Sequence, residues 1–192
     1  FETRIFCHAC PTEVIQAGIT RNSTNFKKYQ YALPYNYRAG GHGGHQMIKI
    51  EFPKDQIKIQ QREATNEIFD VIRKKWIVLT PEEWVRQNIL QYLLLIRNYP
   101  SSLIAVEKEI KLRELRKRCD IVVYNRLSQP WMIIECKEMN VNLSEKTIEQ
   151  ILRYHITLQA QYLIITNGKY CFGFEKKSGQ FFQINNFPEF ES

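Results

Sequence analysis

The sequence predicts an α/β domain in which a mixed β-sheet is flanked by helices, and three observations support this prediction. Short runs rich in β-branched and aromatic residues recur along the chain, and such runs are typical of strands. Two other segments show the apolar spacing of amphipathic helices and begin at capping residues. Of the 192 residues, 44% are hydrophobic and 24% are charged, a balance that suits one globular domain with a sizeable core.

Residues 1–46 differ in character from the rest of the chain. They contain the Gly-rich run 39–45, several Tyr and Asn residues, and little apolar periodicity. The chain begins with Phe1, and Met47 is a candidate native start. We therefore expect residues 1–46 to be a poorly ordered or extraneous extension and residues 47–192 to form the domain.

A zinc site in this extension is the alternative. Cys7 and Cys10 form a Cys-x2-Cys pair, and His42 and His45 form a His-x2-His pair. The 31 residues between the two pairs are more than a usual zinc finger contains. A poorly ordered leader is therefore favoured over a zinc site.

The first half of the domain is predicted to contain a strand meander and a helix. Short strands are expected at residues 57–59, 68–70 and 76–79. Thr80 then has the position of a helix cap, with Pro81 in the first turn and Glu83 completing a capping box. The helix should run to about residue 97, before Pro100.

The second half reads as a βαββ arrangement around a mixed sheet. A first core strand is expected at residues 103–110, followed by a hairpin at 120–137, a helix at 144–158 and strands at 162–166, 170–174 and 181–184. The helix crossover predicts that strand 162–166 is a parallel neighbour of the hairpin. Asn167-Gly168 and Ser178-Gly179 supply the last two turns.

The register of the hairpin follows from its loop. The apolar runs 120–124 and 131–137 flank the turn-rich stretch 125–130. If Asn125 pairs with Pro130 across a four-residue loop, the numbers of opposed residues sum to 255. The hairpin is expected to be buried on both faces because consecutive positions are apolar.

This register brings three charged residues together. Asp120 faces Glu135, and Lys137 projects from the same face two residues further along. Two buried carboxylates can hold Mg²⁺, which prefers hard oxygen ligands, and a metal-bound water is a nucleophile for phosphodiester hydrolysis. Lys137 would then orient or deprotonate that water, or stabilise the developing negative charge. The alternative is a structural ion pair in which Lys137 neutralises the carboxylates.

At these residues the chain resembles the PD-(D/E)XK nuclease superfamily, whose signature is an Asp, a hairpin and then Glu-x-Lys. More closely, residues 47–192 resemble small stand-alone proteins related to the N-terminal nuclease domain of type I restriction enzyme R subunits. The stretches that carry this resemblance are residues 68–75, 79–87, 98–107, 117–124, 134–137 and 150–154. The ordered set is more specific than a lone Glu-x-Lys, and it implies a restriction-endonuclease-like fold.

The resemblance also implies roles for individual residues. Asp120 and Glu135 match the metal ligands, and Lys137 matches the catalytic lysine. Gln150 and Tyr154 match a Gln-x-x-x-Tyr element, and their spacing places them on one face of a helix.

Two further metal ligands are candidates. Related nucleases often place a site glutamate on the first helix, and Glu82 is our choice for it. Acidic residues are also favoured in any first helical turn, so Glu82 and Glu83 have a purely structural reading as well. The thiol of Cys136 should face the core, but its main-chain carbonyl is available to a metal.

The sequence departs from the family pattern in two respects. Cys119 stands where the superfamily name has its proline, a position that is loosely kept. The helicase motor of restriction R subunits is not expected, because the sequence contains no Gly-x-x-x-x-Gly-Lys-Ser/Thr phosphate loop.

The charge distribution favours DNA as a partner. The net charge is +7, and residues 47–192 hold 22 basic and 18 acidic residues, which leaves +4. Basic residues lead directly to Asp120, namely Lys111, Arg113, Arg116, Lys117 and Arg118. Such an entry suits a phosphate backbone, and we assign DNA contact to the four from Arg113 to Arg118. A solvated loop is the alternative for this segment.

Location and partners follow from composition. Five cysteines, mostly beside apolar runs, fit a reducing cytoplasm. The sequence has no run of 18 apolar residues, so we expect no membrane contact. The expected partners are DNA, other subunits of a restriction system and a second copy of the chain in a homodimer.

The function that these observations favour is DNA hydrolysis dependent on Mg²⁺ or Mn²⁺, linked to restriction or defence. The second hypothesis is a binding module with a nuclease-like fold that recruits nucleic acid or a partner protein without cutting it. A third is a structural partner that has no nucleic-acid contact.

Overall fold

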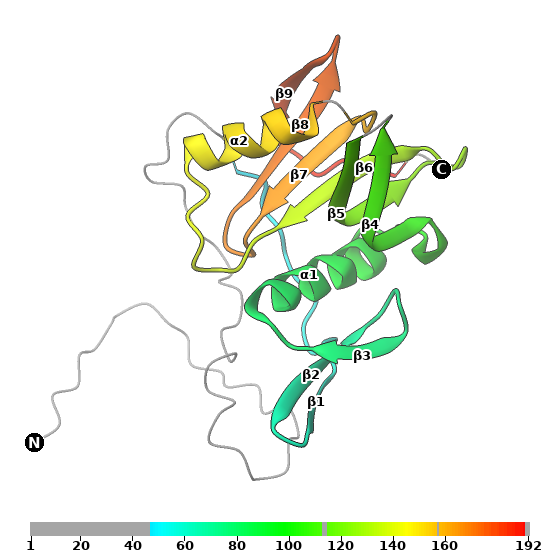
Figure 1. Cartoon of the computed structure of the whole chain (residues 1–192), viewed down its shortest axis with the longest axis vertical. Helices are drawn as coiled ribbons and strands as arrows, with labels where there is room; N and C mark the ends of the chain where they lie inside the picture. Colours follow the sequence, from blue (N-terminus) through cyan, green and yellow to red (C-terminus); the bar gives the residue numbers. More distant parts are fainter. Residues whose placement is uncertain (1–46, 113–114, 157, 191–192) are drawn as a thin grey trace, which may run out of the picture. The chain divides into compact units, whose positions relative to one another are not determined.

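The computed structural model describes residues 47–112, 115–156 and 158–190, which belong to one compact unit of the chain (Figure 1). The expectations for residues 1–46, including the zinc alternative, lie outside the described residues. Only the backbone is described for Lys111, Leu112, Leu115, Lys117 and Tyr154. In the described part of the chain, no helix is long and apolar enough to cross a membrane.

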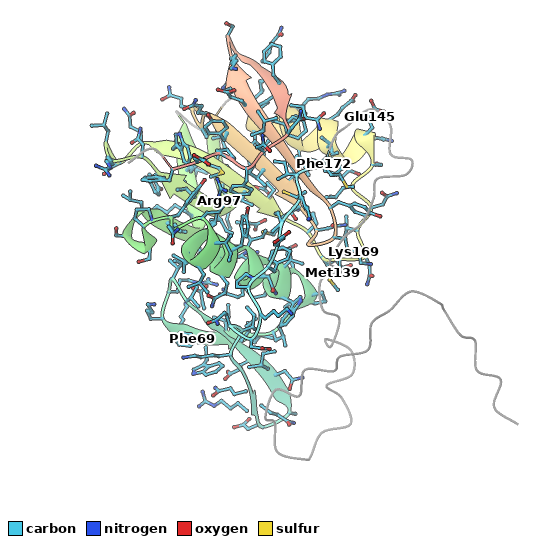
Figure 2. All side chains as sticks on the ribbon, turned by 180° about the vertical axis from the view of Figure 1, so that it is seen from behind. Phe69, Arg97, Met139, Glu145, Lys169 and Phe172 are labelled. Carbon is cyan, nitrogen blue, oxygen red and sulfur yellow. The ribbon has the colours of Figure 1, made fainter. Side chains whose placement is uncertain are left out.

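The domain begins with the predicted meander. Strands β1 (Ile59–Arg62), β2 (Thr65–Asp70) and β3 (Lys75–Val78) pair in antiparallel fashion, in that order, to form a three-stranded sheet. Phe69, labelled in Figure 2, packs edge-to-face against Trp76 across β2 and β3. The three predicted strands are confirmed, with bounds that differ by a few residues.

Helix α1 (Pro81–Gln91) starts where its capping signal predicts. The Thr80 hydroxyl accepts a hydrogen bond from the Glu83 amide at 3.0 Å, and Pro81 occupies the first turn. The helix continues into a π-helical turn, η2 (Tyr92–Ile96), so the helical segment ends within one residue of the predicted position. A short 3₁₀ turn, η3 (Ser101–Leu103), then leads into the main sheet.

The main sheet has six strands in the order β4-β5-β6-β7-β8-β9. Its strands and crossover helix are β4 (Ile104–Leu112), β5 (Leu115–Tyr124), β6 (Pro130–Cys136), α2 (Glu145–His155), β7 (Tyr162–Thr166), β8 (Cys171–Lys177) and β9 (Gln180–Ile184). Only β6 and β7 pair in parallel, across the α2 crossover, among these strands. The mixed sheet and the βαββ order are confirmed, and the fold is α/β and restriction-endonuclease-like.

Helices α1 and α2 cover opposite faces of this sheet (Figure 1). On the α1 side, Ile89 packs in one buried cluster with Ile121 and Ile134. On the α2 side, Ile148 packs in a second cluster with Phe172, which is labelled in Figure 2. Burial on both faces explains why β5 and β6 read as continuous apolar runs.

The β5–β6 register agrees with the predicted index sum over most of its length. Ile121 pairs with Ile134, and Val123 pairs with Met132, so each sum is 255. At the loop, however, a register shift follows Val123, and Pro130 pairs with Tyr124. The expected pairing of Asn125 with Pro130 is therefore wrong. The irregularity at the loop takes up the extra residue and leaves the inner register unchanged.

A network of ion pairs joins the two sheets. Arg73, which follows β2, donates from Nε to Asp70 Oδ2 at 2.6 Å, and its Nη1 pairs with Glu107 of β4. Arg118 of β5 also pairs with Glu107. Burial opposes ionisation of Glu107, but the hydrogen bonds and charges of Arg73 and Arg118 outweigh it and hold the pKa of this carboxyl below its usual range.

Substituting Glu107→Gln should therefore destabilise the fold in a pH-dependent way. At neutral pH the free energy of unfolding should fall by roughly 0.5–1 kcal/mol, as for other partly exposed ion pairs. Because the folded-state pKa is lowered, the wild-type advantage is complete above the unfolded pKa of about 4.3 and is lost as pH falls through the folded-state value. Urea unfolding of both proteins from about pH 7 to about pH 3 measures this. A difference that stays constant with pH would contradict the assignment.

Candidate functional site

Asp120 lies on β5 and is held from two directions. Its Oδ1 accepts a hydrogen bond from Arg86 Nη2 of α1 at 2.9 Å, and its Oδ2 accepts one from the main-chain amide of Cys136 at 2.8 Å. The second bond ties Asp120 to the end of β6, next to Glu135 and Lys137. The carboxylate is therefore placed at the point where α1 meets the hairpin.

Arg86 is a site residue that sequence reasoning missed. It is buried, and its guanidinium also contacts Glu82 Oε1 at 2.9 Å and Glu83 Oε2. Gln87 Nε2 donates to Glu83 Oε1 at 2.9 Å. The spacing of Arg86 from Glu83 and Glu82, at three and four residues, could have indicated these contacts. One buried cation thus forms ion pairs with three carboxylates.

The pKa of the Glu82 carboxyl is shifted by burial and by the charges that surround it. Burial and the nearby charge of Asp120 raise the pKa of the Glu82 carboxyl above its usual range, although Arg86 and Lys137 lower it. Glu135 also raises it. The charges of the residues predicted as metal ligands and catalytic lysine therefore act on one another at this site.

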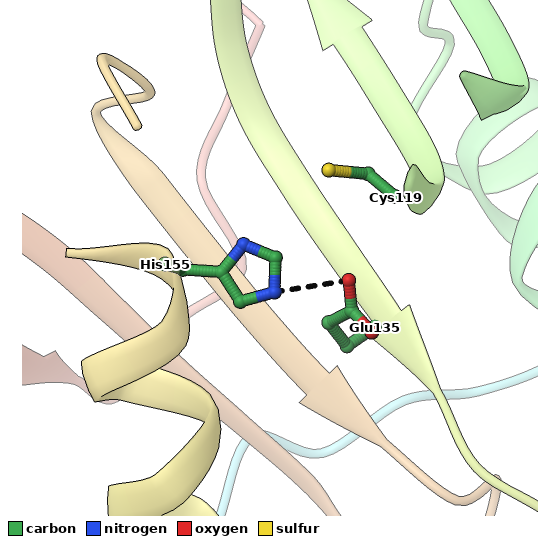
Figure 3. A group of neighbouring side chains, drawn as sticks. All are labelled: Cys119, Glu135 and His155. Carbon is green, nitrogen blue, oxygen red and sulfur yellow. Dashed lines mark ion pairs between the residues drawn. The ribbon is translucent and has the colours of Figure 1, made fainter. Parts of the chain in front are cut away.

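Glu135 faces a different helix from Asp120. Its Oε1 lies 3.0 Å from Nε2 of His155, which is buried on α2, and the thiol of Cys119 points toward the same place (Figure 3). The ligand atoms of these three residues all lie within 4.8 Å of one another. The expectation that Asp120 and Glu135 share one face is therefore wrong: Asp120 is bound by α1, and Glu135 is bound by α2.

The reason is an interruption of strand alternation at Asp120. Cys119 and Val122 belong to the same buried cluster on the α2 side, whereas strict alternation would place residues three apart on opposite faces. The opposing residue in β4, Glu107, has a φ of +51°, which is an uncommon conformation for a non-glycine residue. Strands β4 and β5 pair on both sides of this position but not at it, and Asp120 is turned toward α1.

The three carboxylates predicted to bind metal are not gathered as tightly as the group around His155. In the described part of the chain, only the Cys119, Glu135 and His155 ligand atoms form a cluster of three within 4.8 Å. Arg86 lies between the Glu82 and Asp120 carboxylates and binds both. A metal bound by these oxygens would have to replace part of this ion pairing.

Cys136 is the last residue of β6, and Lys137 follows it directly. The amide of Lys137 donates to Thr166 of β7 at 2.8 Å, and its side chain is half-buried near Glu82. The Cys136 side chain is fully buried in the core cluster on the α1 side, where burial raises the pKa of its thiol well above the usual range. This thiol packs in the core as predicted.

The other predicted site residues that the structure describes lie on α2 and in strand β5. Gln150 is exposed on α2, and the Tyr154 backbone lies one turn later. Lys111 lies in β4, and Arg116, Lys117 and Arg118 lie in β5, so these four basic residues are in strands and not in a loop.

On these two strands the arginines have acidic neighbours. Arg116 and Arg118 are exposed, and they pair with Glu109 at 3.7 Å and with Glu107, respectively. Arg113 lies outside the described residues. His155 is buried on α2, and its spacing of seven residues from Ile148 is consistent with the buried face of this helix.

Comparison with known proteins gives a match to a protein family. No curated protein matches the chain significantly. Residues 81–188, from the start of α1 past the end of β9, match the family model described as the type I restriction enzyme R protein N terminus. The match covers more than half of the 192 residues and includes all the residues of the candidate site. The chain therefore belongs to the family of type I restriction enzyme R protein N-terminal domains.

Proposed function

We propose that this protein is a Mg²⁺-dependent nuclease that hydrolyses DNA phosphodiester bonds within a restriction system. The family relates the chain to restriction systems, and the activity is inferred from the site. The observation that carries the proposal is the excess of negative charge where α1 meets the β5–β6 hairpin. Mn²⁺ is the expected substitute for Mg²⁺ because both prefer oxygen ligands.

The charge excess can be counted. Six carboxylates are linked by ion pairs or nearby charge to four cations; the carboxylates are those of Asp70, Glu82, Glu83, Glu107, Asp120 and Glu135, and the cations are those of Arg73, Arg86, Arg118 and Lys137. Their formal sum is −2, which one divalent cation would neutralise. The raised pKa of Glu82 has the direction expected for a carboxyl in such surroundings.

The donor set suits Mg²⁺. Glu82 and Asp120 offer carboxylate oxygens, Glu135 would join them by turning away from His155, and the Cys136 carbonyl is a fourth candidate ligand. Bound there, Mg²⁺ would lower the pKa of a coordinated water and offset the negative charge that develops on a phosphate. Structural zinc sites are built mainly from sulfur and nitrogen ligands, which Glu82 and Asp120 do not provide.

The chain's own residues then have distinct tasks. Arg86 holds Asp120 and Glu82 in place through its two Nη2 contacts. Lys137 carries the positive charge nearest the β6 end of the site and would orient or deprotonate the attacking water, or stabilise the phosphate charge. Gln150 and Tyr154 would position the phosphate or Lys137. The exposed Arg116 and Arg118 would contact the DNA backbone.

DNA and the other subunits of a restriction system are the proposed partners. The alternative is a module that binds nucleic acid without cutting it. In that case the contact between Arg86 and Asp120 would be a permanent structural ion pair. The two functions differ in one respect: only the nuclease requires a divalent cation and Lys137.

Replacing Lys137→Ala should abolish metal-dependent cleavage without unfolding the protein. General acid–base groups contribute about 10²–10⁴-fold to rate, so we expect a loss of at least about 10²-fold. Plasmid, linear and single-stranded DNA incubated with Mg²⁺ or Mn²⁺ supply the measurement, and circular dichroism checks the fold. Lys146→Ala, at an exposed position in the first turn of α2, is the matched control and should cleave as the wild type does.

Undiminished cleavage by the Lys137→Ala variant would refute the role of this lysine. Tight, salt-sensitive DNA binding by the wild type with no cleavage under any metal condition would favour the binding module. The absence of both cleavage and binding would favour a structural partner.

Replacing Arg86→Met should destabilise the metal-free protein and increase its response to Mg²⁺. Removing one partner of a buried ion pair costs about 3–5 kcal/mol, because the remaining charges are left uncompensated. Mg²⁺ should restore more stability to this variant than to the wild type, since it neutralises the same carboxylates. Urea unfolding with and without Mg²⁺ measures both effects.

Two further variants complete this test. Arg153→Met removes an exposed pair with Glu149 and should cost less than about 0.5 kcal/mol, with no gain from Mg²⁺. Arg86→Lys keeps the charge and serves if the Met variant does not fold. Equal responses to Mg²⁺ in the wild type and both Arg86 variants would show that the cation does not bind these carboxylates.

A further inference from the structure

A second group of ligand atoms lies on the α2 side of the sheet. The Cys119 thiol, the Glu135 carboxylate and the His155 imidazole converge from β5, β6 and α2 (Figure 3). Cys119 is fully buried, and only 2% of His155 is exposed. Exposed acidic groups often gather without any ion, but a buried thiol, imidazole and carboxylate meeting at one point is a different arrangement.

The spacing of these atoms is close to that of a tetrahedral metal site. Zinc bonds of about 2.0–2.3 Å to N, O and S separate neighbouring ligand atoms by about 3.3–3.6 Å. Here His155 Nε2 and Glu135 Oε1 are 3.0 Å apart, and all three ligand atoms lie within 4.8 Å of one another. Side-chain shifts of about 1 Å or less would bring them to bonding positions.

The ligand types select the class of metal. Thiolate sulfur binds soft or borderline cations, and imidazole suits zinc and its neighbours, whereas Mg²⁺ takes oxygen ligands. Three protein ligands leave one tetrahedral position for water. The Asp120 side chain, which is bound by Arg86 on the other side of the sheet, is not part of this group.

We propose that Cys119, Glu135 and His155 form a binding site for a zinc-class divalent cation. A metal site of this kind requires the Cys119 thiol, whereas a simple ion pair between Glu135 and His155 would not require it. It is separate from the Arg86-bound carboxylates but shares Glu135 with the proposed Mg²⁺ ligands.

Sharing Glu135 has a consequence that rests on the proposed nuclease function. If the Glu135 carboxylate binds zinc on the α2 side of the sheet, it is not available as a Mg²⁺ ligand on the α1 side. Zinc should therefore slow Mg²⁺-dependent cleavage, and removing the thiol should weaken this effect. Metal binding and cleavage are measured separately, so each proposal can fail without the other.

The binding test uses the full chain in a background that removes the other cysteine pair. Cys7→Ser and Cys10→Ser together eliminate the Cys-x2-Cys pair of residues 1–46, so any thiolate ligation must come from the domain. Equilibrium dialysis with Zn²⁺ under reducing conditions should give one ion per chain. Titration with Co²⁺ should produce the near-ultraviolet charge-transfer band of a cobalt–thiolate bond, which reports the ligand directly.

Matched variants in this background identify the ligands. Cys119→Ser, His155→Gln and Glu135→Gln should each weaken Zn²⁺ binding by at least about 100-fold, because losing even an outer-sphere partner of a metal ligand costs about 10–100-fold. Cys171→Ser changes another buried thiol, on β8, and should bind Zn²⁺ normally. Circular dichroism checks the fold of each variant. The Co²⁺ spectrum of the background protein tests thiolate ligation even if a variant of the cluster does not fold.

The outcomes separate the two proposals. No Zn²⁺ binding, no thiolate band, or equal binding by the Cys119→Ser and Cys171→Ser proteins would overturn the zinc site. One bound Zn²⁺ that depends on Cys119 would confirm it, even if the protein cleaves no DNA, a result that would contradict the nuclease function alone. The effect of Zn²⁺ on cleavage is the ratio of the cleavage rates with and without Zn²⁺. If this ratio is the same in the Cys119→Ser and Cys171→Ser proteins, the sharing of Glu135 is overturned.

Discussion

The ion pair between Arg86 and Asp120 joins helix α1 to strand β5 and sets the electrostatics of the proposed nuclease site. Charges removed from water must be compensated, and Arg86 compensates Asp120, Glu82 and Glu83 at once. The carboxylates remain in excess even so, because Glu135 adds a further charge nearby. In the proposed function, such a site would be stable without metal and would still favour a divalent cation. It also explains why a buried arginine stands beside residues that resemble metal ligands.

Local signals in the sequence were sufficient to predict most elements of the fold. The Thr80 cap and Pro81 predicted the start of α1, and the Asn167-Gly168 turn predicted the β7–β8 hairpin. The extension of β4 and β5 beyond the apolar core could not be predicted in this way. Its charged residues have low strand propensity, and cross-strand pairs such as Arg116 with Glu109 contribute to its pairing instead.

The site could be predicted only in part. The turn and the apolar runs predicted the inner register of β5 and β6, which places Asp120 near the end of β6. The direction of its side chain depends on contacts that are distant in sequence. The left-handed conformation of Glu107 interrupts the pairing, and Arg86 binds Asp120 from another element. Period-2 alternation fails at a strand irregularity of this kind, and there it gave the wrong face for Asp120.

The most direct test of the account is a crystal structure of the protein soaked in Mn²⁺, recorded at a wavelength where manganese scatters anomalously. The account predicts an anomalous peak bound by oxygens of Asp120 and at least one of Glu82 and Glu135. It also predicts that the contacts between Arg86 and these carboxylates lengthen. No peak at saturating Mn²⁺, with Arg86 still bound to Asp120 as in the metal-free protein, would contradict the claim that these carboxylates bind a divalent cation.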